Sequence, residues 1–293
     1  MRVRWTIGLL AGAAVIVGLS AIGSGLMADA GGPTGIPQHV AVPAYLDPTT
    51  GAADWTELIG STDRVSLLVA NVNNGPTSAV NPGWANVIGR AHRAGITVIG
   101  YVDTGYLGTT GLATRSGPPD IATWTAQIES DVDGWYRLYG NDMGGIFFDQ
   151  AQNRCGPAAA STVWSDAYRT LTDYVKHNHP GAITVSNPGT VVPQCYQDAA
   201  DVLVTFEGSY AAYTGHPAAG EPPYTAPGWN PSSPTKFWHI VYDAPNSSEL
   251  EQAIGLAKTR GAGYVYVTPA TMPNPYDRIP PADYWADEQN HVG

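Results

Sequence analysis

The chain has 293 residues, of which only 13% are charged, and its formal net charge is −11. It contains no run of Lys and Arg that could form a basic patch, which argues against nucleic acid and anionic membrane surfaces as partners.

The N-terminal segment predicts export from the cytoplasm. Two arginines precede an uncharged stretch at residues 5–27, and Ala28-Asp29-Ala30 then gives the A-x-A pattern that signal peptidase cleaves. The stretch could also just span a bilayer, so an uncleaved anchor is the alternative. We expect a signal peptide at residues 1–30 and a secreted catalytic domain at residues 31–293. Cleavage would remove two Arg and one Asp, leaving a net charge of −12.

Strand and helix patterns alternate along the rest of the chain. Strands are expected at 39–46, 64–70, 96–102, 145–148, 182–186, 201–206, 237–242 and 263–267. Helical patterns are expected at 84–94, 121–139, 161–178 and 247–260, and they are less clear after the fifth, sixth and eighth strands. Alternation of this kind over about 260 residues predicts an α/β fold with a single (β/α)8 TIM barrel.

Loop lengths predict which face of this barrel carries function. Connections from helices into strands are short and contain glycine, whereas those that leave strands are long, at 103–119, 150–160 and 207–236. Because barrel enzymes build their active sites at the carboxyl ends of the strands, we expect elaborated functional loops at that face.

Two apolar strands end abruptly in a carboxylate, at Asp149 and Glu207. An acid at the end of a buried strand is costly to desolvate, and in a parallel barrel its usual purpose is catalysis. The structural alternative is a pair of buried acids tied to backbone or arginine, but only Arg154 is near either in sequence. The fourth and sixth strands have the same parity, so the two carboxyl groups could approach the roughly 5–5.5 Å separation of a retaining glycosidase. We therefore expect Asp149 as nucleophile and Glu207 as general acid/base.

Further polar and aromatic residues at the strand ends suit a polyhydroxylated ligand. The candidate substrate-binding residues are Tyr45, Asn71, Asn73, Tyr101, Asp103, Gln150, Asn187, Tyr210, Trp229, His239 and Tyr242. Several have structural alternatives: the asparagines could satisfy loop backbone, and His239 has the sequence context of a packed core histidine. Trp229 and Tyr224 are the loop aromatics expected to stack on sugar.

Cys155 and Cys195 are the chain's two cysteines. In an oxidising compartment we expect a disulfide that joins the loops after the fourth and fifth strands, with two separate buried thiols as the alternative. Closing a loop of about 41 residues contributes on the order of 4 kcal/mol in the chain-entropy model. No zinc spacing, nucleophile elbow or dinucleotide fingerprint occurs, so we expect neither metal nor cofactor.

At these residues the chain resembles the spherulin-4-like proteins (spherulation-specific family 4), which correspond to glycoside hydrolase family 135. The resemblance runs from about residue 42 to residue 276 and rests on Val-Pro-Ala-Tyr-Leu-Asp-Pro, Val-Ala-Asn-Val-Asn-Asn-Gly-Pro, Gly-Tyr-Val-Asp-Thr-Gly-Tyr, Gly-Ile-Phe-Phe-Asp-Gln, Ser-Asn-Pro-Gly-Thr and Thr-Phe-Glu-Gly-Ser-Tyr. It implies a (β/α)8 barrel and, for fungal members, endo-acting cleavage of α-1,4-linked N-acetylgalactosamine in galactosaminogalactan. The family's acidic cluster maps onto Asp149, the next position and Glu207, but this chain has Gln150 where the fungal enzymes have Glu.

Two hypotheses follow from these observations. The first is a secreted, monomeric glycoside hydrolase acting on an amino-sugar-containing polysaccharide, favoured by retention of both carboxylates. The alternative is a non-catalytic carbohydrate-binding or cell-envelope protein on the same barrel, favoured by Gln150.

Overall fold

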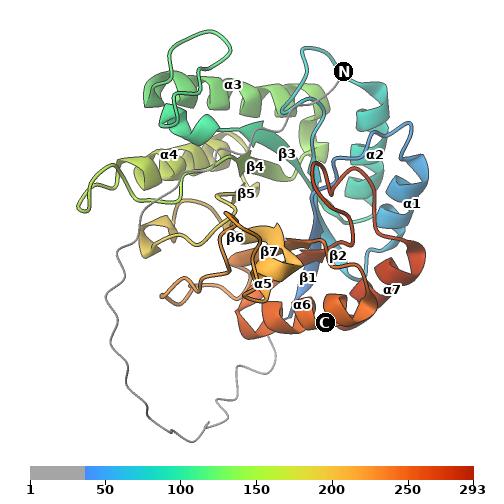
Figure 1. The fold of residues 1–293 in the computed structure, drawn as a ribbon. Helices are drawn as coiled ribbons and strands as arrows, with labels where there is room; N and C mark the ends of the chain where they lie inside the picture. The colour runs from blue at the N-terminus through green and yellow to red at the C-terminus, as the bar shows by residue number, and fades with distance from the viewer. Residues whose placement is uncertain (1–36) are drawn as a thin grey trace, which may run out of the picture. The chain divides into compact units, whose positions relative to one another are not determined.

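A computed structural model describes residues 37–293, so the expected signal peptide or anchor at residues 1–30 lies outside the described residues. The described part forms one compact unit built on a closed barrel of parallel strands in the order β1 to β8 (Figure 1). The predicted (β/α)8 barrel is therefore confirmed. Within residues 37–293, no helix has the length and apolar character needed to cross a membrane.

The strands lie close to their expected positions. They are β1 His39–Val42, β2 Val65–Ala70, β3 Thr97–Asp103, β4 Gly145–Asp149, β5 Ile183–Ser186, β6 Val202–Ser209, β7 Phe237–Tyr242 and β8 Ala262–Val267. Strand β1 ends four residues before its expected end, and β6 continues three residues beyond its expected end because Ser209 still pairs with Tyr242 of β7. Glu207 therefore lies within a strand and not after one.

The helices surround the barrel unevenly. They are α1 Ala52–Gly60, α2 Pro82–Arg93, α3 Ile121–Tyr139, α4 Val163–Asn178, α5 Tyr210–Tyr213, α6 Ser247–Thr259 and α7 Ala282–His291. The four predicted helices are present, whereas the ranges of α1 and α7 were not predicted. Between α4 and α6 the barrel is covered by coil, the short α5 and a 3-10 turn at Gln194–Tyr196 (Figure 1).

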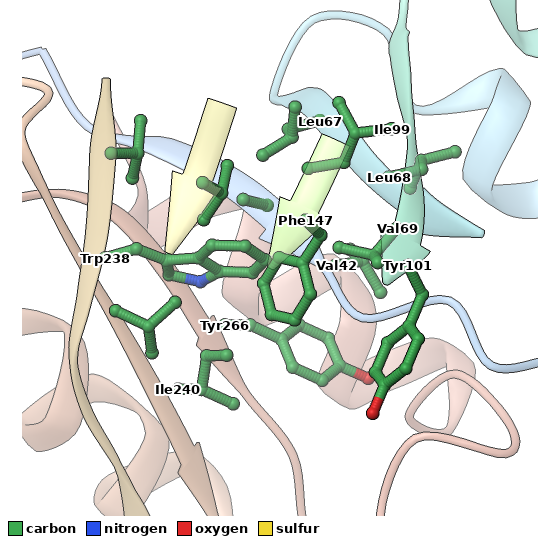
Figure 2. Packing of buried hydrophobic residues seen from close by; sticks show 14 of the residues in the cluster. Val42, Leu67, Leu68, Val69, Ile99, Tyr101, Phe147, Trp238, Ile240 and Tyr266 are labelled. Atoms are coloured by element: carbon green, nitrogen blue, oxygen red, sulfur yellow. The ribbon is translucent and has the colours of Figure 1, made fainter. Parts of the chain in front are cut away.

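Aromatic side chains fill the barrel interior (Figure 2). The ring of Phe147 lies 5.7 Å from that of Trp238 and 6.2 Å from that of Tyr101. All three residues are at most 1% exposed, and each buried aromatic contributes roughly 1.5–3 kcal/mol of hydrophobic free energy. The rings form a packed apolar floor beneath the polar groups at the carboxyl ends of the strands.

The face at the carboxyl ends of the strands carries the long loops and the strained backbone, as the loop lengths predicted. All non-glycine residues with positive φ in the described chain follow strands at this face, namely Asn74, Tyr106, Leu107, Gln150 and Asp243. Such conformations cost of order 1–3 kcal/mol each and concentrate at functional sites. The predicted disulfide is also confirmed here, because the sulfur atoms of Cys155 and Cys195 are bonded at 2.10 Å.

Candidate active site

Two strands direct Asp149 and Glu207 into the mouth of the barrel. Asp149 is the last residue of β4, two positions after the interior residue Phe147. Glu207 pairs in register with Ile240, whose side chain lies among the core residues of the barrel (Figure 2). Because alternate residues of a strand share a face, both carboxylates stand above the aromatic floor.

A single amide joins the two carboxylates. Asn187 Nδ2 donates to Asp149 Oδ1 and to Glu207 Oε2, each at 2.7 Å. The two oxygens lie on either side of one nitrogen, so they are separated by at most twice that distance, 5.4 Å. This upper limit agrees with the roughly 5–5.5 Å spacing of retaining glycosidases and is shorter than the 6.5–9.5 Å of inverting ones.

Tyrosines occupy the outer oxygens of the pair. Tyr101 donates its hydroxyl to Asp149 Oδ2 at 2.6 Å, and Tyr276 donates to Glu207 Oε1 at 2.8 Å. The ring of Tyr45 stands edge-on to both, with centroids 5.8 Å from Tyr101 and 5.7 Å from Tyr276. Strand β3 and the loops after β1 and β8 therefore contribute Tyr101, Tyr45 and Tyr276 to one continuous aromatic wall.

Burial and charge set the protonation of this group. Burial, followed by the negative charge of Glu207, raises the pKa of Asp149 to about 7, although the Tyr101 hydroxyl and the Gln150 backbone N–H partly oppose the shift. Burial and the neighbouring carboxylates also raise the pKa values of Tyr45, Tyr101 and Tyr276 well above their usual range. The tyrosines therefore stay protonated, and Asp149 retains its proton up to near neutral pH.

Buried hydroxyls fix the backbone that follows the first carboxylate. Thr104 Oγ1 lies 2.8 Å from the Asp149 carbonyl oxygen and 2.9 Å from that of Gln150, and 3.0 Å from the hydroxyl of Tyr168. Gln150 itself has a φ of 52°, which turns the chain sharply out of β4. The strain at this position holds Asp149 in a defined orientation.

Other acidic and aromatic residues surround the pair. Asp103 pairs in register with Asp149, and burial raises the pKa of its carboxyl although Oδ1 accepts the Gly105 N–H at 2.8 Å. Tyr242 lies near Glu207, and burial together with the charge of Glu221 raises its pKa to about 12. The site is thus polar, acidic and lined by phenol rings.

Three residues that were predicted to bind substrate do not face this site, so these predictions are wrong. They are His239, Tyr210 and Trp229. His239 is completely buried, with Nδ1 2.7 Å from the Tyr213 hydroxyl and Nε2 3.1 Å from Thr205 Oγ1. Burial lowers its pKa to about 3, so it is a neutral core histidine. Strand alternation explains the error, because His239 points to the opposite side of β7 from Ile240.

The other two corrections concern aromatic residues. Tyr210 donates its hydroxyl to Gln252 of the outer helix α6 at 2.5 Å. Trp229 packs its ring 5.2 Å from Phe237, the first residue of β7, and so lies at the end of that strand opposite the carboxylates. Tyr224 likewise packs against the core residues Phe206 and Tyr213. The long loop after β6 descends along the outside of the barrel, which its length alone did not reveal.

Asn71 and Asn187, which were predicted to bind substrate, make hydrogen bonds within the protein. Asn71 Oδ1 accepts the Asn74 N–H at 2.7 Å and builds the loop after β2, in which Asn73 is exposed. Asn187 is 6% exposed and uses both amide hydrogens on the carboxylates, so these hydrogens are not free for substrate. Gln150 and Asp103 remain partly exposed at the mouth.

Sequence reasoning missed Tyr276 and Glu221. Tyr276 comes from the long loop at residues 268–281, whose irregular sequence has no periodicity to predict its direction. Its one signal is an aromatic residue in a loop that leaves a strand. Glu221 accepts from the backbone N–H and the hydroxyl of Ser209, at 2.9 and 2.8 Å, and is brought to the mouth by the long loop after β6.

Two further features of the described residues bear on the site. Within residues 37–293 no group of three His, Cys, Asp or Glu side chains could hold a metal ion. A surface hollow of about 460 Å³ lies along the loop at residues 268–281, which also carries Tyr276.

Comparisons with known proteins agree with this architecture. The model of spherulation-specific family 4 matches residues 39–292. Sph3 of Aspergillus clavatus, solved in complex with GalNAc, is similar in structure, with a TM-score of 0.65, 23% identity, and coverage of 87% of this chain and 97% of that one. Alpha-L-fucosidase isoenzyme 2 of Paenibacillus thiaminolyticus has a TM-score of 0.52 and 12% identity, covering 87% of this chain and 48% of that one. A search of curated protein sequences finds no significant match.

Proposed function

Because the chain belongs to spherulation-specific family 4, we propose that it is a secreted glycoside hydrolase that cleaves an amino-sugar-containing polysaccharide with net retention of configuration. The observation that carries this proposal is the carboxylate pair bridged by one amide nitrogen, at most 5.4 Å apart. This separation leaves no room for a water between the acids and the sugar, which an inverting enzyme requires.

In the proposed mechanism Asp149 attacks the anomeric carbon while Glu207 gives its proton to the departing glycosidic oxygen. The resulting glycosyl–Asp149 ester is then cleaved by a water that Glu207, now ionised, deprotonates. The mechanism needs Asp149 ionised at the moment of attack, so the proton that Asp149 holds near neutral pH in the free site must leave it when the sugar binds.

Hydrogen-bond donors support this division of roles. Asp149 accepts from the Tyr101 hydroxyl, the Asn187 amide and the Gln150 backbone N–H, whereas Glu207 accepts from the Asn187 amide and the Tyr276 hydroxyl. Each donor stabilises the ionised form of its carboxyl group, and Asp149 has one more. These donors stabilise the Asp149 carboxylate once its proton has left, although burial and the charge of Glu207 raise the pKa of Asp149 in the free site.

We further propose α-1,4-linked N-acetylgalactosamine, as in galactosaminogalactan, as the substrate linkage. Support comes from the family membership and from the structural likeness to Sph3, which was solved with GalNAc. Among the phenol rings of the site, those of Tyr45 and Tyr242 are only partly buried, and they offer the apolar and hydrogen-bonding surface that a sugar needs.

The proposal is tested with purified galactosaminogalactan and the secreted protein. We expect release of reducing ends, a first product with retained anomeric configuration by proton NMR, and loss of turnover by at least about a thousandfold in Asp149→Asn and Glu207→Gln. Inversion of configuration would overturn the role of Asp149 as nucleophile.

Gln150 favours a second candidate, a non-catalytic carbohydrate-binding or cell-envelope protein, because a carboxylate of the family's acidic cluster is missing. Capture of the polymer by the protein without reducing-end release would support that candidate. Release at a rate that Gln150→Ala lowers less than Asp149→Asn would support the hydrolase.

A further inference from the structure

We propose that Asn187 is a positioning residue, which holds Asp149 and Glu207 at the spacing of a retaining pair by giving one N–H of its amide to each. This inference rests on the proposed function for its catalytic meaning, but the geometry that carries it stands independently. Both hydrogen bonds are 2.7 Å long, in the range of strong bonds to ionised acceptors.

The orientation of the Asn187 amide is fixed by its own loop. Asn187 Oδ1 accepts the Gly189 backbone N–H at 2.9 Å, and only the oxygen of the amide can accept there. The nitrogen must therefore face the carboxylates. Gly189 has a φ of 65°, a left-handed conformation that glycine adopts without strain.

The backbone around Asn187 is tied to both catalytic strands. The Asn187 N–H donates to the Phe148 carbonyl of β4 at 2.8 Å, and its own carbonyl accepts the Ala151 N–H at 3.0 Å. On the other side, the Glu207 N–H donates to the Gly189 carbonyl at 2.9 Å. One short segment after β5 thus connects the residues next to each carboxylate, so the amide cannot move relative to either.

The donors of this side chain are not free for substrate. A primary amide has two N–H donors, and both are directed at the carboxylates. The side chain is also almost fully buried. Its N–H groups therefore act on substrate through Asp149 and Glu207.

Loss of the amide donors has a defined electrostatic consequence. The other titratable groups around the pair are the phenols Tyr45, Tyr101, Tyr106, Tyr242 and Tyr276 and the carboxyls Asp103 and Glu221. Tyr101 and Tyr276 already donate to the outer oxygens of the pair, and none of these groups is a cation. Without Asn187 the inner oxygens would lose their donor, and Asp149 would hold its proton to higher pH.

Asn187→Asp separates positioning from loop building. Aspartate keeps the oxygen that accepts the Gly189 N–H, and it forms this kind of turn as well as asparagine does, but it has no N–H to donate. Because the new carboxylate also adds a negative charge beside the pair, the shift that it causes is interpreted only together with that of Asn187→Ala. Asn187→Ala removes the donors without adding a titratable group, and it decides the question if the aspartate variant does not fold.

Asn246→Asp is the matched control. Asn246 Oδ1 accepts the Glu249 N–H at the start of α6, and aspartate is an equally good helix cap. The same change of residue is thus made where only the acceptor oxygen is used.

The experiment titrates the carboxyl carbons of Asp149 and Glu207 by ¹³C NMR in all variants and measures kcat/KM where turnover exists. We expect both Asn187 variants to raise the pH at which Asp149 titrates by about one pH unit and to lower kcat/KM about a hundredfold, with the control unchanged. An unshifted titration in both variants would overturn the inference. Shifted titrations without turnover of any polymer by the wild type would leave the inference standing and remove the proposed function.

Discussion

Asp149 is held next to a second carboxylate under conditions that disfavour its ionised form. Burial and Glu207 raise its pKa to about 7 from an ordinary value of 3.8. The folded protein therefore binds a proton that the unfolded chain has released, and between these pH values stability falls as pH rises. Reactivity at this position is achieved at the expense of stability, as is common at catalytic sites.

Asp149→Asn should accordingly stabilise the protein at high pH. The full difference between 3.8 and 7 would correspond to about 4 kcal/mol, and we expect about 2 kcal/mol because Asp149 keeps part of its surface in solvent. Chemical denaturation should show the variant more stable than wild type at pH 8 and equal to it below pH 4. A variant that is less stable than wild type at pH 8 would contradict this account.

Tyr276→Phe tests the hydroxyl that contacts Glu207. The change removes one donor to Oε1 and leaves the ring against Tyr45, so we expect kcat to fall about tenfold with little change in stability. Tyr136→Phe is the control, because the Tyr136 hydroxyl is buried without a hydrogen-bond partner in the described structure. Steady-state kinetics should separate the two variants, and equal kcat values would exclude a role for the Tyr276 hydroxyl.

The residues that the sequence predicted well are those whose strand fixes their direction. Asp149 and Tyr101 follow apolar runs of known parity, and they meet at the mouth as expected. His239 is also on a strand, but the residues of a buried parallel strand are apolar on both faces. The sequence therefore did not indicate whether the His239 side chain points into the barrel or toward the helices. Tyr276 and Trp229 depend on the paths of long loops, which local sequence does not determine.

At the level of elements, the strands were predicted more completely than the helices. The eight strands are continuous apolar runs bounded by glycine-bearing turns, and their ranges were predicted within a few residues. Helix α7 follows Pro281 without a side-chain cap and is mostly polar, whereas α1 begins after Gly51, also without a cap. Both lack the signals that mark a helix start, and packing of Trp285 and Trp55 stabilises them instead.

The disulfide secures the two loops that frame Asn187. Its loop spans a sequence separation of 40 residues, and the Cys155 carbonyl also accepts the N–H groups of Trp164 and Ser165 at the start of α4. Replacing both cysteines by serine should lower the free energy of unfolding by up to about 4 kcal/mol and Tm by about 10 °C. We expect kcat/KM to fall as well, because the loops hold the catalytic pair. Calorimetry that shows an unchanged Tm would contradict the stabilising role.

At the scale of the whole molecule, the barrel brings together residues that are distant in sequence. Strands β4 and β6 have the same parity, so Asp149 and Glu207 lean toward one another across the intervening β5, which supplies Asn187 between them. Three consecutive strands thus bring together Asp149, the bridging amide of Asn187 and Glu207. The aromatic wall of Tyr45, Tyr101 and Tyr276 lies beside these residues and comes from β3 and from the loops after β1 and β8.

Removal of residues 1–30, as the sequence predicts, would give a net charge of −12, and this charge predicts how charged substrates approach this mouth. Asp103, Glu221 and Glu207 surround it, and partly deacetylated galactosamine polymers carry positive charge. Opposite charges accelerate encounter, and salt screens them over about 10 Å at 0.1 M ionic strength. Initial rates on partly deacetylated polymer should therefore fall severalfold between 20 mM and 500 mM salt, whereas rates on the fully acetylated polymer should stay constant. The same salt response for both polymers would show that the field of the protein does not steer its substrate.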